Sequence, residues 1–142
     1  MIVGNPIPFE ARSKLRIPLV SAKVQAGFPS PADDHMERAL DLNEHLVANP
    51  AATFFVRVQG DSMRDAGIAS GDILIVDRSL EPKDRQIVVA MLEGEFTVKR
   101  LRQRGEKVFL EAENSAFKPI EVVKDQELVI WGVVTFVIHQ AR

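Results

Sequence analysis

Cysteine is absent from the 142-residue chain. A disulfide framework, a thiol nucleophile and a cysteine-bound zinc or iron–sulfur centre are therefore excluded. The absence fits a reducing compartment, so we expect a cytoplasmic protein. The three histidines, His35, His45 and His139, show no spacing typical of a metal site, and we expect neither a metal nor another cofactor.

Long apolar runs are also missing. The longest, residues 128–138, is about half the roughly 20 residues that a membrane-spanning helix needs. Prolines and charged residues interrupt the N-terminal segment, which therefore does not resemble a signal peptide. We expect no membrane partner.

Aromatic residues are few, at 6%, and the net charge is only −2. The chain therefore offers little base-stacking surface and no overall attraction for nucleic acid. Arg100, Arg102 and Arg104 alternate along a predicted strand, a pattern typical of a solvated face. We do not expect direct nucleic-acid binding.

The charge is distributed unevenly along the chain. Residues 1–26 carry a charge of +3, which leaves −5 on the remainder. Five prolines punctuate residues 6–31, so the sequence predicts an extended arm with at most one short strand at 16–20. We predict an arm over 1–26 and a single domain over 27–142.

A short helical region should follow the arm. Ser30 and Pro31 have the residue types of an N-cap and a first helical position. Asp41 and Glu44 stand at capping-box spacing, which predicts a second short helix that ends near Asn49.

Beyond the helices the hydrophobic period changes to two, which predicts strands. Glu93-Gly94 predicts a tight turn that joins two of them, since a glycine accepts the required backbone angles. The fold class is therefore mainly β, with a short helical lead-in and an extended N-terminal arm. The predicted strands are 53–59, 73–76, 86–92, 95–102, 107–111 and 127–139.

A possible nucleophile lies directly after the first of these strands, in Gly60-Asp61-Ser62-Met63. A serine that follows a glycine at a strand end can present its hydroxyl, and the turn's backbone amides can face a developing oxyanion. The alternative is an ordinary turn serine that bonds its own backbone.

A serine nucleophile needs a base, and no histidine stands in a recognisable motif. Lysine can serve when burial keeps its amine neutral. Period two places Thr97, Lys99 and Leu101 on one face of a predicted strand, with the arginines on the other. A solvent-facing lysine is the alternative interpretation.

Several segments together resemble the LexA/UmuD family of self-cleaving serine–lysine peptidases. The resemblance covers essentially the whole chain, and AGFPSPA at 26–32 is most similar to the cleavage region of UmuD-type mutagenesis proteins. The other matching segments are GDSM at 60–63, GDILIVD at 71–77, GEFTVKRL at 94–101, DLN at 41–43, NSAF at 114–117 and GVV at 132–134.

The resemblance implies a role for each matching position. Ser62 corresponds to the nucleophile, Lys99 to the general base and Ala26-Gly27 to the bond that is cut. The backbone amides of Asp61 and Ser62 correspond to the oxyanion hole. It also implies a LexA-like, coiled β-sheet fold that forms a homodimer.

The resemblance further implies the partners. A RecA–single-stranded DNA filament would activate the cut, and the trimmed protein would join a Y-family, UmuC-like polymerase subunit in error-prone translesion synthesis during the SOS response. LexA-type repressors carry a helix-turn-helix domain before the cut, whereas only 26 residues precede it here. UmuD itself has cysteine where this chain has Ala26.

Three other classes of protein remain as alternatives. One is a non-catalytic interaction module of the same fold, and another is a LexA-like regulator without a DNA-binding domain. The third is a signal peptidase, which shares the serine–lysine chemistry but is disfavoured by the missing membrane segment. The intact Ser62, Lys99 and Ala26-Gly27 favour the self-cleaving enzyme.

Overall fold

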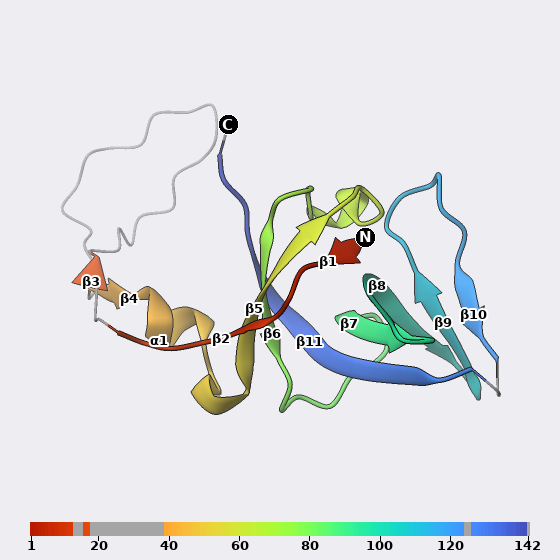
Figure 1. The fold of residues 1–142 in the computed structure, drawn as a ribbon, viewed down its shortest axis with the longest axis horizontal. Coiled ribbons are helices and arrows are strands. Elements are labelled where there is room, and N and C mark those ends of the chain that lie inside the picture. Colours follow the sequence, from red (N-terminus) through yellow and green to blue (C-terminus); the bar gives the residue numbers. More distant parts are fainter. Residues whose placement is uncertain (13–15, 18–38, 124–125, 142) are drawn as a thin grey trace, which may run out of the picture. The chain divides into compact units, whose positions relative to one another are not determined.

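The computed structural model describes residues 1–12, 16–17, 39–123 and 126–141 (Figure 1). The predicted cleavage bond Ala26-Gly27, the helix predicted at Ser30-Pro31, and His35 lie outside the described residues. The chain divides into two compact units, one of residues 1–9 with 49–142 and the other of residues 10–48.

The unit of residues 10–48 contains one described strand pair and one helix. β3 (Arg16–Ile17) pairs antiparallel with β4 (Leu40–Asp41), and α1 (Leu42–Leu46) follows at once. Asp41 is the N-cap, as predicted, and its carboxylate accepts a hydrogen bond from the Asn43 amide at 3.0 Å. The cap satisfies an amide that the first helical turn would leave without a partner.

The larger unit is built on a nine-stranded sheet within the described residues, so the mainly β prediction is confirmed. Two 3-10 turns interrupt it, Pro50–Ala52 and Arg64–Ala66. The strands are β1 (Ile2–Val3), β2 (Ile7–Pro8), β5 (Thr53–Gln59), β6 (Ile73–Asp77), β7 (Ile87–Leu92), β8 (Glu95–Arg104), β9 (Lys107–Glu111), β10 (Ile120–Val122) and β11 (Leu128–Ile138).

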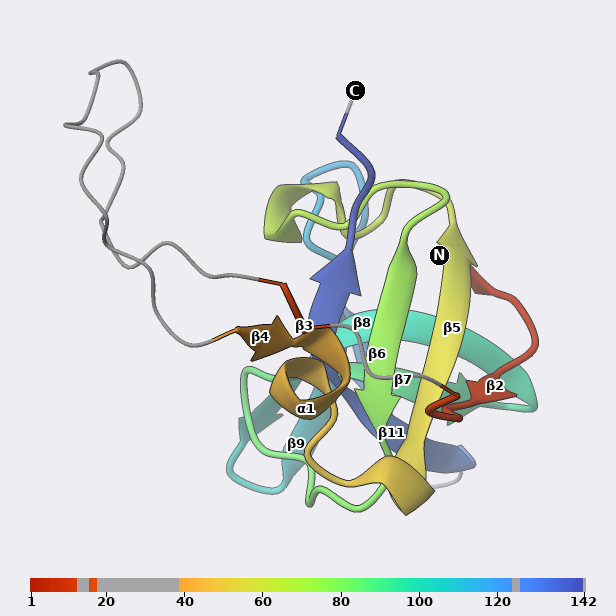
Figure 2. The same ribbon diagram turned by 90° about the vertical axis from the view of Figure 1, so that its left-hand side faces the viewer.

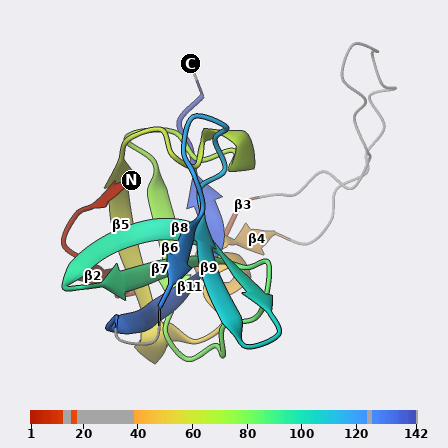
Figure 3. The ribbon, with the colours of Figure 1, turned by 90° about the vertical axis from the view of Figure 1, so that its right-hand side faces the viewer.

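The longest strand, β11, joins the two halves of this sheet. Its first half pairs with β7 and its second half with β6, and the register shifts twice between 130 and 136. Gly132 stands at this crossover, where an added Cβ would lie 2.5 Å from a methyl of Val76. β5, β6 and β11 run side by side in Figure 2, and β7, β8 and β9 in Figure 3.

Two apolar clusters form the core of the larger unit. The first includes Val56 and Val58 of β5, Met63, and Val98 of β8, all fully buried. The second includes Leu101 and packs between β7, β8, β9 and β11. Burying each such side chain contributes about 1.5–3 kcal/mol before its entropy cost. The residues that flank Ser62 and Lys99 are therefore anchored in a packed core.

The strand predictions at 53–59 and 107–111 match the structure, and the predicted Glu93-Gly94 turn has left-handed angles at both residues. The expectation that the N-terminal arm holds at most one short strand, at 16–20, is wrong. β1 and β2 pair with β5, and Met1 and Val3 pack against the first cluster. Among the described residues, no helix has the length and apolar character to cross a bilayer.

Candidate active site

Ser62 lies in the turn that leaves β5. Gly60 adopts φ 104°, a left-handed angle that favours glycine, and its amide donates to Ser70 Oγ at 3.1 Å. The turn then places Ser62 inward beside Met63, and only 1% of Ser62 is exposed. The serine is therefore buried, where the sequence pattern allowed an exposed hydroxyl.

Lys99 is brought to this serine from the middle of β8. Its Nζ donates a hydrogen bond to Ser62 Oγ at 3.1 Å. Lys99 is 7% exposed, and in the sheet it is in register with Val88 of β7. The solvent-facing alternative for Lys99 is thus contradicted. We call Ser62 and Lys99 the dyad.

Burial lowers the pKa of Lys99, because desolvation disfavours the charged amine, and a hydrogen bond with the Met1 amino group acts in the opposite direction. The pKa of the Met1 amino group is itself lowered to about 6 by burial and by the nearby Lys99 charge. The environment therefore favours a neutral lysine, the form that can accept a proton from a hydroxyl.

Two adjoining cavities border the dyad. One is lined by Ser62, Asp61 and Gly60, and the other by Lys99 and Thr97. Met1 and Phe117 line both. A cavity beside a reactive group is the usual place for a bound substrate, and here Met1 forms part of the wall of both cavities.

Asn114 is a buried residue that braces the serine turn. Its Nδ2 donates to the Asp61 carbonyl at 2.8 Å, and its Oδ1 accepts from the Ala116 amide at 3.0 Å. The Glu113 carbonyl also accepts from the Asp65 amide at 2.7 Å, so the loop after β9 holds the turn on both sides of Ser62. Asn114 lies in the NSAF segment at 114–117, and the family resemblance of that segment did not indicate this role.

The Asn114→Ala variant is expected to cleave itself about 5- to 30-fold more slowly, because losing one buried hydrogen bond costs about 1–2 kcal/mol of positioning. The first-order rate of arm loss, followed by mass spectrometry, measures this. Ser115→Ala is the matched control because Ser115 is exposed. A slower rate with an unchanged pH midpoint indicates positioning of Ser62, whereas an unchanged rate contradicts this role.

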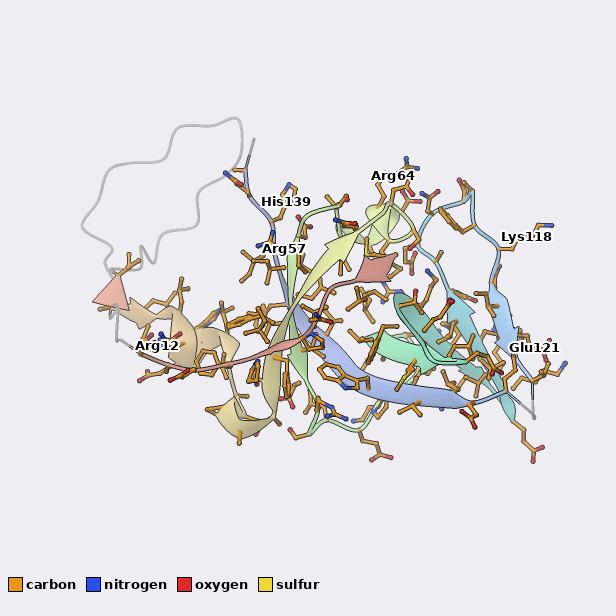
Figure 4. All side chains as sticks on the ribbon, in the orientation of Figure 1. Arg12, Arg57, Arg64, Lys118, Glu121 and His139 are labelled. Atoms are coloured by element: carbon orange, nitrogen blue, oxygen red, sulfur yellow. The ribbon has the colours of Figure 1, made fainter. Side chains whose placement is uncertain are left out.

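The described histidines and the alternating arginines of β8 do not belong to the dyad. His45 and His139 are exposed, and His139 Nδ1 lies 2.7 Å from Asp72 Oδ1 near the end of β11 (Figure 4). Arg100 pairs with Glu113, and Arg102 and Arg104 with Glu111. Each of the three arginines therefore faces a carboxylate in this structure.

The described residues include no group of three or more histidine, aspartate or glutamate side chains placed to hold a metal ion. A hydroxyl beside a desolvated amine is an arrangement suited to nucleophilic attack.

The chain is similar to known proteins over most of its length. The family model described as "Peptidase S24-like" matches residues 18–135. The chain is 46% identical to protein ImpA of Salmonella typhimurium over 125 residues, which cover 88% of this chain and 85% of that protein. It is 46% identical to protein MucA of Escherichia coli over 120 residues, covering 84% and 82% of the two chains.

A repressor is also similar. LexA repressor 1 of Pseudomonas syringae pv. tomato is 45% identical over 139 residues, which cover 96% of this chain and 68% of the repressor. The family model spans both dyad residues and well over half of the chain. The chain therefore belongs to the S24-like peptidase family.

Proposed function

We propose that this protein is a serine endopeptidase that cuts its own Ala26-Gly27 bond, with Ser62 as nucleophile and Lys99 as general base. The observation that carries the proposal is the 3.1 Å contact between Lys99 Nζ and Ser62 Oγ in a buried setting that lowers the lysine pKa. Membership of a peptidase family supports the same chemistry.

In the first step, Ser62 Oγ attacks the Ala26 carbonyl carbon while Lys99 Nζ takes the hydroxyl proton. The backbone amides of Asp61 and Ser62 would stabilise the oxyanion of the tetrahedral intermediate. The C–N bond then breaks, and Lys99 gives its proton to the leaving Gly27 amine.

In the second step, water attacks the acyl-serine ester and Lys99 accepts its proton. The second tetrahedral intermediate then collapses and frees the Ala26 carboxylate. Lys99 returns its proton to Ser62 Oγ, which restores the hydroxyl. The small side chains of Ala26 and Gly27 favour this bond, because the backbone must approach the buried serine closely. Carrying substrate and catalyst in one polypeptide gives a high effective concentration.

The biological setting is proposed by analogy with the relatives. A RecA–single-stranded DNA filament would stimulate the cut, and the trimmed homodimer would serve as an accessory subunit of a UmuC-like, Y-family translesion polymerase in the SOS response. The similarity to ImpA and MucA over most of their length supports this assignment. A cytoplasmic location follows from these partners.

The site of the cut is tested by incubating the purified chain with an activated RecA filament and sequencing the new N-terminus. We expect a fragment that begins Gly27-Phe28-Pro29, and no fragment from the matched Ser62→Ala variant. A fragment that begins elsewhere contradicts the site assignment. No cleavage under any condition favours the non-catalytic interaction module of the same fold.

A further inference from the structure

The edges of two strands face each other beside the dyad, and a third strand bridges them. β5 pairs with β6 along one edge, and β8 pairs with β7. On their other edges, β1 pairs antiparallel with the end of β5 and with the start of β8 (Figures 1 and 3). β1 therefore occupies the sheet edge on which a peptide would have to bind to reach Ser62.

The backbone contacts of β1 define this binding site. Ile2 is in register with Gln59 of β5 and with Thr97 of β8, two residues before Lys99. The Gly4 amide donates to the Arg57 carbonyl at 2.8 Å and anchors the strand just beyond its end. These are the contacts by which a sheet edge binds an extended peptide of any sequence.

Further contacts place β1 directly beside the dyad. Met1 lines the cavity beside Ser62 as well as the one beside Lys99, and Val3 packs against the apolar core. Thr97 Oγ1 lies 3.4 Å from the Met1 carbonyl. A Cβ on Gly60 would lie 3.4 Å from Met1 Cα, so β1 also passes close to the serine turn.

We propose that the facing edges of β5 and β8 form a strand-binding site whose resident occupant is β1, and that the segment to be cut must displace β1. The inference rests on the proposed function, because it names the competitor of the self-cleavage substrate. A strand edge pairs with one strand at a time, so β1 and the cleavage segment exclude each other. The observed rate is then the intrinsic rate multiplied by the fraction of molecules in which β1 has left.

The Gly4→Pro variant tests this competition, because proline has no amide hydrogen to donate to the Arg57 carbonyl. We expect unaided self-cleavage to accelerate about five- to tenfold. Asn5→Ala, at the next and exposed position, should keep the parent rate. A second variant, Val3→Asp, weakens the same strand through its core contact and should also accelerate cleavage.

Inhibition in trans provides a complementary measurement. A synthetic peptide with the sequence of residues 1–9 should slow the Gly4→Pro protein back toward the parent rate, and a peptide that carries Val3→Asp should not. Unchanged rates in both protein variants, or equal effects of the two peptides, would overturn the competition.

Occupancy of the site is measured separately from catalysis in the full-length Ser62→Ala variant. Amide hydrogen exchange followed by NMR should show the Gly4 amide protected more than about tenfold relative to Asn5. Exchange of Gly4 at the rate of a free peptide would overturn the proposal whether or not the parent cleaves itself. Protection of Gly4 with no cleavage in any variant would contradict the proposed function and the displacement step, and would leave only the occupancy supported.

Discussion

Replacing either Ser62 or Lys99 by alanine is expected to reduce self-cleavage at least about a thousandfold. The reason is the single contact between Lys99 Nζ and Ser62 Oγ, since neither group can activate the reaction without the other. Because the two act as a unit, the double variant should be no slower than either single variant. The rate is measured as loss of the intact mass over several days.

The free energy of unfolding, measured for the parent and the variants, shows whether these losses of cleavage come from lost chemistry and not from lost folding. Burial lowers the pKa of Lys99, so the charged amine opposes folding below that pKa, and this penalty fades as the pH rises toward the ordinary lysine value of about 10.4. Lys99→Met should therefore be as stable as the parent at pH 7 or more stable. Lys107→Ala, an exposed position on β9, is the control and should keep the parent rate. Normal cleavage by a folded Lys99→Ala protein would show that another base operates.

Unaided self-cleavage is expected to accelerate steadily from pH 7 into the alkaline range. A lysine base acts only when neutral. As long as the pH is below the lysine pKa, each increase of one pH unit raises the neutral fraction about tenfold. The direction follows from the lowered pKa of Lys99, which brings the midpoint below that of an ordinary lysine. Initial rates of arm loss across a pH series measure this profile.

The RecA filament should move this profile toward lower pH. A filament that favours the docked arm would exclude more water from Lys99 and so lower its pKa further. A histidine base would behave differently, because its rate would level off near neutrality. A plateau reached by pH 7 without the filament would therefore contradict the assignment of Lys99 as base.

The sequence predicts the strands of this fold best where turn residues mark their ends. Thr53–Gln59 and Lys107–Glu111 begin and end as predicted, because a glycine turn adjoins each of them, at Gly60 after the first and at Gly105 before the second. β10 was not predicted, since its three residues are too few to show a period. β1 and β2 were missed for the same reason, and because prolines and glycines near them favour an irregular arm.

The candidate site was predictable in its residues but not in its surroundings. The resemblance named Ser62 and Lys99, and period two placed Lys99 apart from the neighbouring arginines. Neither pattern could reveal that Asn114 holds the Asp61 carbonyl, because that contact joins residues 53 positions apart. The presence of β1 beside the dyad is likewise a long-range contact without a sequence signature.

Whether Lys99 serves as the base for Ser62 is tested most directly by titrating its amine. NMR of the full-length Ser62→Ala protein can follow the Lys99 side chain across pH, and the parent's cleavage rate can be measured in the same buffers. We predict a Lys99 pKa below the ordinary value of about 10.4 that coincides with the midpoint of the rate profile. A Lys99 amine that titrates at the ordinary value, beside a rate profile with a different midpoint, would contradict the serine–lysine mechanism.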